Sequence, residues 1–203
     1  MKRITALLLV CLFILSGCSA APKQALSDLL GTLEGSTYTS ALGFVIDAAG
    51  LHAFSESDLA AVNQVDEFTP EALAAQTDSG NAVTVFAAAS GAQASISLSL
   101  FPAAGLPEDV QTAEEYAAYG LSLISGKLES AGYADVRVQQ ISVRLDDGEH
   151  PAVLCSAKIS GGVPYHLLQI CFREGDWMGG LSLSSVESEE ALRQLLTRVT
   201  STN

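Results

Sequence analysis

Three glycine-containing turn signals divide the C-terminal part of the chain into β-rich runs. They are Asp147-Gly148, Gly161-Gly162 and Glu174-Gly175. Each fits a tight turn between two such runs. Earlier in the chain, residues 83–89 and 95–101 flank a further turn signal at Gly91-Ala92. Runs joined by turns this short pair as antiparallel neighbours, so the sequence predicts an antiparallel sheet.

Helix start signals lie before, between and after these runs. Thr112 and Glu115 form a capping box at the start of the longest predicted helix. The last predicted helix has an apolar stripe that runs from Leu192 to Val199. The candidate N-caps are Ser55, Thr69, Thr112 and either Ser185 or Ser188. Together these elements predict an α+β domain, with a six- or seven-stranded, mostly antiparallel sheet and packed helices.

The first hairpin has two unlike faces, because serines alternate with apolar residues over 95–101. A two-residue turn at Gly91-Ala92 pairs Ala87 with Ile96. One face then carries the apolar residues Ile96, Leu98 and Leu100, and the other carries Ser95, Ser97 and Ser99. The serine row fits either a binding strip or the wetter face of the sheet.

The N-terminus carries an apolar run that is too short to cross a membrane. Lys2 and Arg3 precede twelve almost unbroken apolar residues, Ile4 to Leu15. A helix needs about 20 residues to span a bilayer core, whereas a basic start followed by a short apolar centre is typical of an export signal. The run ends in Leu15-Ser16-Gly17-Cys18, which resembles the lipobox of bacterial lipoproteins.

The lipobox resemblance implies a covalent anchor and a site of cleavage. In that family the cysteine thiol, here that of Cys18, receives a diacylglyceryl group, and the chain is cut just before it. The chain then divides into a signal peptide (1–17), a tether (18–36) and a single α+β domain (37–203). The implied location is the extracytoplasmic face of a bacterial membrane, with membrane lipid as a partner through Cys18. The alternative is a plain signal peptide that ends in a cysteine.

The tether is expected to hold the domain at a short distance from the lipid. It is rich in Ala, Ser and Gly, and as a coil of about 18 residues it would average about 25 Å in length. Leu26, Leu29, Leu30 and Leu33 have helical spacing, so part of it can form a short helix on the domain or on the membrane surface.

The charge of the chain excludes nucleic acid as an expected partner. The net charge is −13, and it becomes −15 after cleavage because residues 1–17 contain Lys2 and Arg3 but no acid. Nucleic-acid binding needs a basic face. The acids fit a solvated, solubilising surface.

Cys155 and Cys171 are the cysteines of the expected mature domain. An exported protein can hold a disulfide. A two-residue turn at Gly161-Gly162 places the two thiols on opposite faces of the sheet, whereas a loop longer by one residue places them on one face but offset. Neither register allows a disulfide, so we expect two free, buried thiols.

Cys155 and His166 are the parts of a candidate nucleophilic dyad, because the two-residue turn places them diagonally on one face. A two-residue turn at Glu174-Gly175 would then place Leu183 opposite His166. An apolar face raises the pKa of a thiol and disfavours this dyad. The sequence has no metal-ligand spacing, phosphate loop or Gly-x-Ser-x-Gly elbow. We therefore predict no catalytic, cofactor-binding or metal-binding residue.

The order of elements, together with TYTSALGFVIDAAG at residues 37–50, resembles the PsbP/Mog1-like domains of some small bacterial lipoproteins. The resemblance covers the layout of residues 38–199. It implies a domain that acts by binding other proteins and not by catalysis. No binding residue carries over, because no site motif is shared.

The expected function is therefore that of a membrane-anchored, extracytoplasmic lipoprotein with a non-catalytic binding domain. Its expected partners are membrane lipid through Cys18 and a protein or envelope component of unknown identity, without a cofactor. One alternative is an envelope enzyme whose site is assembled from residues far apart in the sequence. A transporter's solute receptor would use the same anchor, but one domain leaves no room for its two-lobed cleft.

Overall fold

The computed structural model describes residues 25–159 and 161–201. The large sheet has the spatial order β4 (His52–Ala53), β5 (Val83–Ser90), β6 (Ala94–Pro102), β10 (Trp177–Ser185), β9 (Pro164–Glu174), β8 (Gly148–Lys158) and β7 (Ala134–Leu145). The small sheet has the order β1 (Thr32–Glu34), β2 (Thr37–Thr39), β3 (Phe44–Asp47) and β11 (Val199–Ser201). The helices are η2 (Leu26–Leu29), α1 (Glu56–Asn63), α2 (Pro70–Asp78), η3 (Ala103–Gly105), α3 (Ala113–Ser130) and α4 (Glu189–Leu196).

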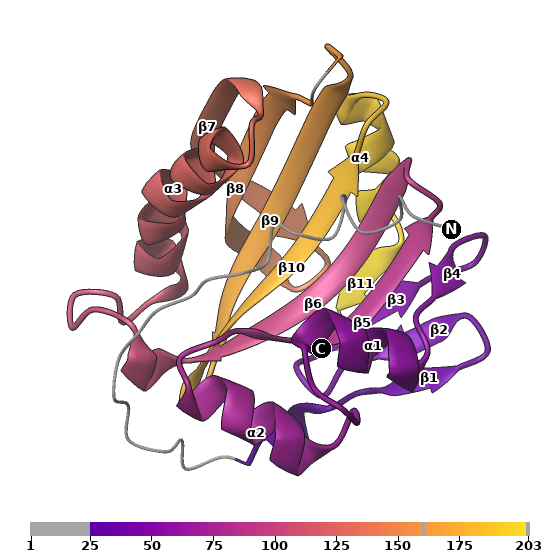
Figure 1. The fold of residues 1–203 in the computed structure, drawn as a ribbon, viewed down its shortest axis with the longest axis vertical. Helices are drawn as coiled ribbons and strands as arrows, with labels where there is room; N and C mark the ends of the chain where they lie inside the picture. Colours follow the sequence, from indigo (N-terminus) through magenta and orange to yellow (C-terminus); the bar gives the residue numbers. More distant parts are fainter. Residues whose placement is uncertain (1–24, 160, 202–203) are drawn as a thin grey trace.

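All strand pairs described are antiparallel, which confirms the predicted α+β class with a seven-stranded sheet. The small second sheet was not predicted. Figure 1 shows α3 in front of the large sheet, with α4 and the small sheet behind it. No helix among the described residues is long and apolar enough to cross a membrane.

Each face of the large sheet has its own hydrophobic core. The α3 face carries Val153, Cys155 and Leu167, which pack with α3. The α4 face carries Leu168 and Leu181, which pack with α4 and the small sheet. Because successive side chains of a strand point to opposite faces, the apolar strands β8, β9 and β10 supply both cores.

The helix starts follow the predicted capping signals. Ser55 and Thr112 each form a capping box, with Asp58 and Glu115 respectively, and Thr69 caps α2 with Pro70 in its first turn. Of the two candidates for the last helix, Ser188 is the N-cap. The stripe predicted to run to Val199 is interrupted, because α4 ends at Leu196 and the chain then forms β11 on the edge of β3.

The predicted strand registers are wrong by one or two residues. In the first hairpin Ile96 pairs with Ala88 and not with Ala87, and a bulge between Thr84 and Phe86 then shifts the pairing. Leu183 lies opposite Leu168 and not His166. The first error comes from the length of a turn, because the loop after Ser90 has three residues and not two. The second comes from the position of a turn, because the two-residue turn after β9 begins one residue later than predicted.

The serine row is an internal feature of the sheet. Ser95, Ser97 and Ser99 are buried, and β6 pairs with β10 so that Ser95 lies opposite Ser184. Their hydroxyl oxygens are 2.7 Å apart, and those of Ser99 and Thr84 are 3.0 Å apart. The row is therefore neither wet nor free to bind, because hydroxyl groups of the neighbouring strands β5 and β10 lie within hydrogen-bond distance of it.

Residues 25–36, expected to belong to the tether, pack on the domain. Leu26 and Leu29 of η2 are buried in the core of the α4 face, and β1 pairs with β2. The backbone N–H of Gly31 donates to the Tyr38 hydroxyl over 3.1 Å. Of the two places open to the short helix, the domain and the membrane surface, the helix lies on the domain. Cys18 lies outside the described residues.

Candidate functional site

Cys155 and Cys171 are free and buried, as predicted. The loop between β8 and β9 is one residue longer than the two-residue turn, so Cys155 lies opposite Leu167. Both thiols therefore lie on the α3 face, at strand positions too far apart to bond. Burial raises the pKa of the Cys155 thiol to about 11 and that of Cys171 to about 12. Neither thiol is available as a nucleophile near neutral pH.

The Cys155–His166 dyad is not formed. His166 lies between Ser156 and Ser185, and its side chain is on the α4 face, opposite to that of Cys155. Its buried Nδ1 atom has no hydrogen-bond partner in the described part of the chain. The same register that brings the two thiols onto one face separates this imidazole from both of them.

Asp147, His150 and Ser201 come together although they are far apart in the sequence. The His150 Nε2 atom lies 2.9 Å from the Asp147 carboxylate, which also accepts a hydrogen bond from Ser201. These two contacts, that with His150 foremost, lower the pKa of Asp147. In a catalytic triad the imidazole lies between the hydroxyl and the carboxylate. Here the carboxylate lies in the middle, so the contact ties the β7–β8 turn to β11 and activates no nucleophile.

Acidic and sulfur-containing side chains form no metal site among residues 25–159 and 161–201. No group of three or more His, Cys, Asp or Glu residues in this part could hold a metal ion. The acids of the β7–β8 turn have local partners instead, as with Glu149, which lies 3.6 Å from Arg144.

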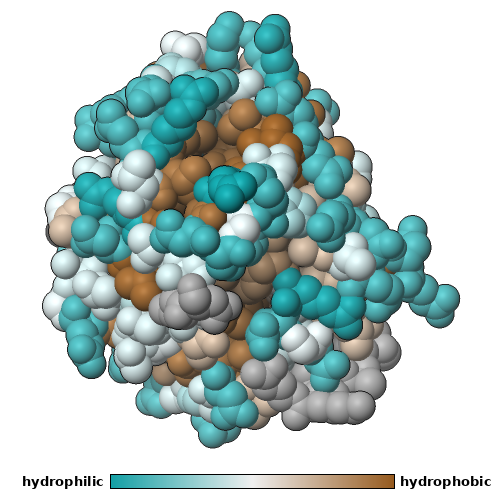
Figure 2. Space-filling model, turned by 180° about the vertical axis from the view of Figure 1, so that it is seen from behind, coloured by the Kyte–Doolittle hydropathy of each residue, from teal (hydrophilic) through white to brown (hydrophobic). Residues whose placement is uncertain are grey.

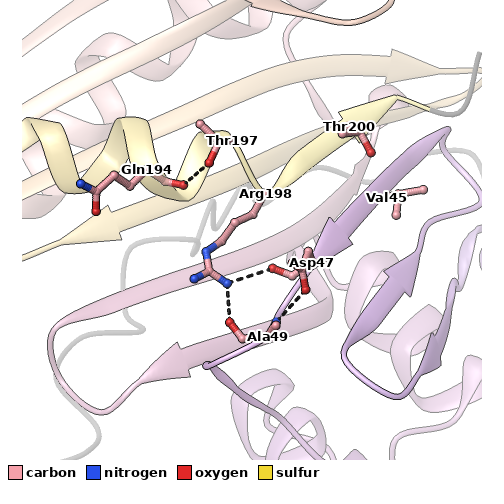
Figure 3. Close-up of a pocket in the computed structure, with 7 residues that line it drawn as sticks. All are labelled: Val45, Asp47, Ala49, Gln194, Thr197, Arg198 and Thr200. Atoms are coloured by element: carbon pink, nitrogen blue, oxygen red, sulfur yellow. Dashed lines mark hydrogen bonds between the residues drawn. The ribbon is translucent and has the colours of Figure 1, made fainter.

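A polar hollow of about 490 Å³ lies between β3 and the residues that follow α4. Figure 3 shows Arg198 reaching across it to the backbone carbonyl oxygens of Asp47 and Ala49. The Asp47 carboxylate accepts from the Ala49 N–H over 2.8 Å. The guanidinium thus fixes the turn after β3, and the hollow has a structural explanation.

An apolar groove of about 330 Å³ lies on the α4 face, between α4 and strands β7 to β9. It forms because α4 packs on β9 and β10 and leaves part of β7 and β8 uncovered. The apolar lining residues are Ile141, Val143, Leu154, Leu168, Leu192 and Leu196. Arg144, Arg193 and Glu189 border the groove. Figure 2 shows this face, with apolar side chains in a hollow of the upper half, bordered by hydrophilic ones.

An open strand edge borders the same groove. β7 ends the large sheet and pairs only with β8 among the described strands. Its pairing with β8 is regular from Arg137 to Leu145, and this stretch contains no Pro, with charged residues at its two ends, Arg137 and Arg144. Every second residue of an edge strand points its N–H and C=O outward. The groove and the edge together form the candidate site, and the sequence signal for it is the position of β7 at the end of the meander.

No family model and no curated protein matches the chain. Among solved structures it is similar to PA94, a protein of unknown function from Pseudomonas aeruginosa, at 14% sequence identity and a TM-score of 0.34. The match covers 53% of this chain and 73% of that one. A likeness this low carries no argument, and the resemblance to PsbP/Mog1-like domains stays a prediction. The function is therefore argued from the groove and from the N-terminal sequence.

Proposed function

We propose that the chain is a membrane-anchored, extracytoplasmic lipoprotein whose domain binds an extended polypeptide without catalysis. The lipobox at Leu15 to Cys18 supports the anchor. One observation carries the binding role, namely that an apolar groove lies directly beside an unpaired strand edge.

An extended polypeptide uses both parts of the candidate site. Its backbone can pair with the outer edge of β7, and every second side chain then points to the α4 face and into the groove. An acyl chain would fill the groove but leave the edge unpaired. The rim offers both signs of charge, with Arg144 and Arg193 beside Glu189, so it forms a polar border around an apolar floor, as interfaces do.

The chemistry of the lining favours binding over catalysis. The residues that line the groove include no Cys or His. The buried thiols lie on the other face of the sheet, and the Asp147 contact has the wrong order for proton transfer to a hydroxyl. A general base or nucleophile would have to lie within hydrogen-bond reach of a bound substrate. Of the lining residues of these types, Ser142 donates its hydroxyl to Glu149 over 2.6 Å, and Glu189 is an exposed acid at the rim.

A library of random ten-residue peptides tests the proposal on the purified mature chain. We expect the selected peptides to carry apolar residues at every second position and to slow hydrogen exchange of the β7 amides. Leu196→Asp should weaken their binding at least about tenfold, because it charges the apolar floor. Val163→Asp is the matched control, since Val163 is 44% exposed and lies outside the groove. Peptides that bind both variants equally, or that leave β7 exchange unchanged, would contradict the proposal.

A further inference from the structure

The distance between the proposed anchor and the folded domain is set by few residues. Leu26 is the first buried residue in the described part of the chain, with 5% of its surface exposed, and Leu29 is 1% exposed. η2 lies against α2, so the chain is fixed to the domain from this point. Seven peptide links separate Cys18 from Ala25. They span at most about 25 Å when fully extended and about 15 Å on average as a coil.

The anchored end and the far end of the domain lie at opposite ends of its long axis. Figure 1 shows the first described residues and α2 at the lower end, and the β8–β9 loop at the upper end. Val163 belongs to this upper loop, between β8 and β9. The groove lies in the upper half of the opposite view, in Figure 2.

Apart from Lys23, which lies between Cys18 and the domain, the part of the chain nearest the proposed anchor carries charge of one sign. Residues 25–126 contain thirteen Asp or Glu residues and no Lys or Arg. Asp28 of η2 and Glu71 and Asp78 of α2 are exposed at the anchored end. An anionic lipid surface repels such an end over a screening length of about 8 Å at physiological salt.

The seven Lys and Arg residues of the domain lie on later elements, from residue 127 on, and three of them form ion pairs with acids in the described part of the chain. Arg144 pairs with Glu149, and Arg193 with Glu190, at 3.6 and 3.1 Å. Lys158 pairs with Asp135 at 2.6 Å. An acid paired with a cation offsets the attraction of that cation to an anionic surface. The short covalent leash from Cys18 to Ala25 limits how far the domain can turn toward the lipid.

We propose that the η2–α2 end of the domain faces an anionic lipid surface, and that the acids of this end prevent the domain from resting with its long side on the membrane. The β8–β9 loop and the groove are then presented away from the lipid. The orientation rests on the proposed anchoring at Cys18. It also restricts the binding partner, because a polypeptide must reach the groove from the side away from the membrane.

Energy transfer from the protein to lipid headgroups measures this orientation. The lipid-modified chain is placed in phosphatidylcholine vesicles, with or without phosphatidylglycerol, that contain an acceptor-labelled lipid. A donor dye is attached to Ser27→Cys in one protein and to Val163→Cys in another. Both sites are exposed, whereas the native Cys155 and Cys171 are buried with raised pKa values and resist labelling.

We expect energy transfer at position 27 to exceed that at position 163 by about twofold or more. The leash limits the distance of position 27 from the lipid but not that of position 163. Phosphatidylglycerol should lower transfer at position 27 in low salt, and high salt should restore it. A Gly/Ser insertion after Gln24 that doubles the leash should reduce the difference between the two sites. Equal transfer at both sites, or higher transfer at position 163, would overturn the orientation.

The mass of the N-terminal peptide of the same preparation separates the two proposals. A lipid-modified Cys18 with equal transfer at both sites overturns the orientation alone. An unmodified Cys18 overturns the proposed anchoring on which the orientation depends.

Discussion

At the scale of single residues, Gly179 and Gly126 differ in the space that surrounds an added side chain. A Cβ atom at Gly179 in β10 would lie 2.0 Å from the Phe172 ring, whereas one at Gly126 in α3 would meet nothing within 4 Å. Gly179→Ala should therefore destabilise the domain by about 2 kcal/mol or more. Gly126→Ala should stabilise it by up to about 1 kcal/mol, because alanine favours the helix. Urea unfolding measures both, and a Gly179→Ala protein as stable as wild type would contradict the packing described.

The Asp147 carboxylate gives the stability of the domain a pH dependence. Its pKa is lowered in the folded chain, mainly by His150. Its contribution is therefore present above the unfolded pKa, about 3.9, and is lost as pH falls through the lowered value. Asp147→Asn should cost up to about 1 kcal/mol at pH 7 and little near pH 2, by urea unfolding. Asp146→Asn changes the same charge in the same turn, and an equal loss there would show that the contact contributes nothing.

The two cysteines and His166 show which side-chain positions the sequence could predict. The burial of Cys155 and Cys171 followed from apolar surroundings, which the sequence displays directly. The separation of His166 from Cys155 did not, because one extra residue in the β8–β9 loop moves the whole of β9 by one position. Since side chains alternate with a period of two, that single residue decides which groups share a face.

At the scale of elements, the start of α3 depends on its capping box. The Thr112 hydroxyl accepts from the Glu115 N–H over 3.2 Å, and the Glu115 carboxylate accepts from the Thr112 N–H over 2.9 Å. Thr112→Ala should lower the free energy of unfolding by about 1 kcal/mol. Thr112→Ser keeps the hydroxyl and should behave like wild type. Equal losses in chemical denaturation for the two variants would show that the hydroxyl is not the cause.

The elements that sequence could predict are those with local signals. Capping residues and glycine turns fix α1, α2, α3 and the strands of the meander, and all of them form. β11 lacks such a signal, because Val199 continues the apolar spacing of α4 and only its pairing with β3 makes it a strand. The groove was also invisible, since it depends on where α4 crosses the large sheet and not on any one segment.

At the scale of the whole molecule, the stretch of acids and the groove lie on different parts of the chain. Residues 25–126, which follow Lys23, carry acids without Lys or Arg, and the groove lies among the later elements. A binding surface on a lipid-anchored domain is accessible only if it faces away from the bilayer. In the proposed arrangement, the short leash from Cys18 to Ala25 supplies that geometry without any contact between the domain and the lipid.

The covalent anchor at Cys18 is the claim on which this account depends, and the mass and location of wild-type and Cys18→Ala chains in a bacterial host test it most directly. We expect the wild-type chain to begin at Cys18, to carry a diacylglyceryl group and to sediment with the membrane fraction. Cys18→Ala should carry no lipid and should not be cut before position 18. A Cys18→Ala chain that is processed and membrane-bound like wild type would contradict the account.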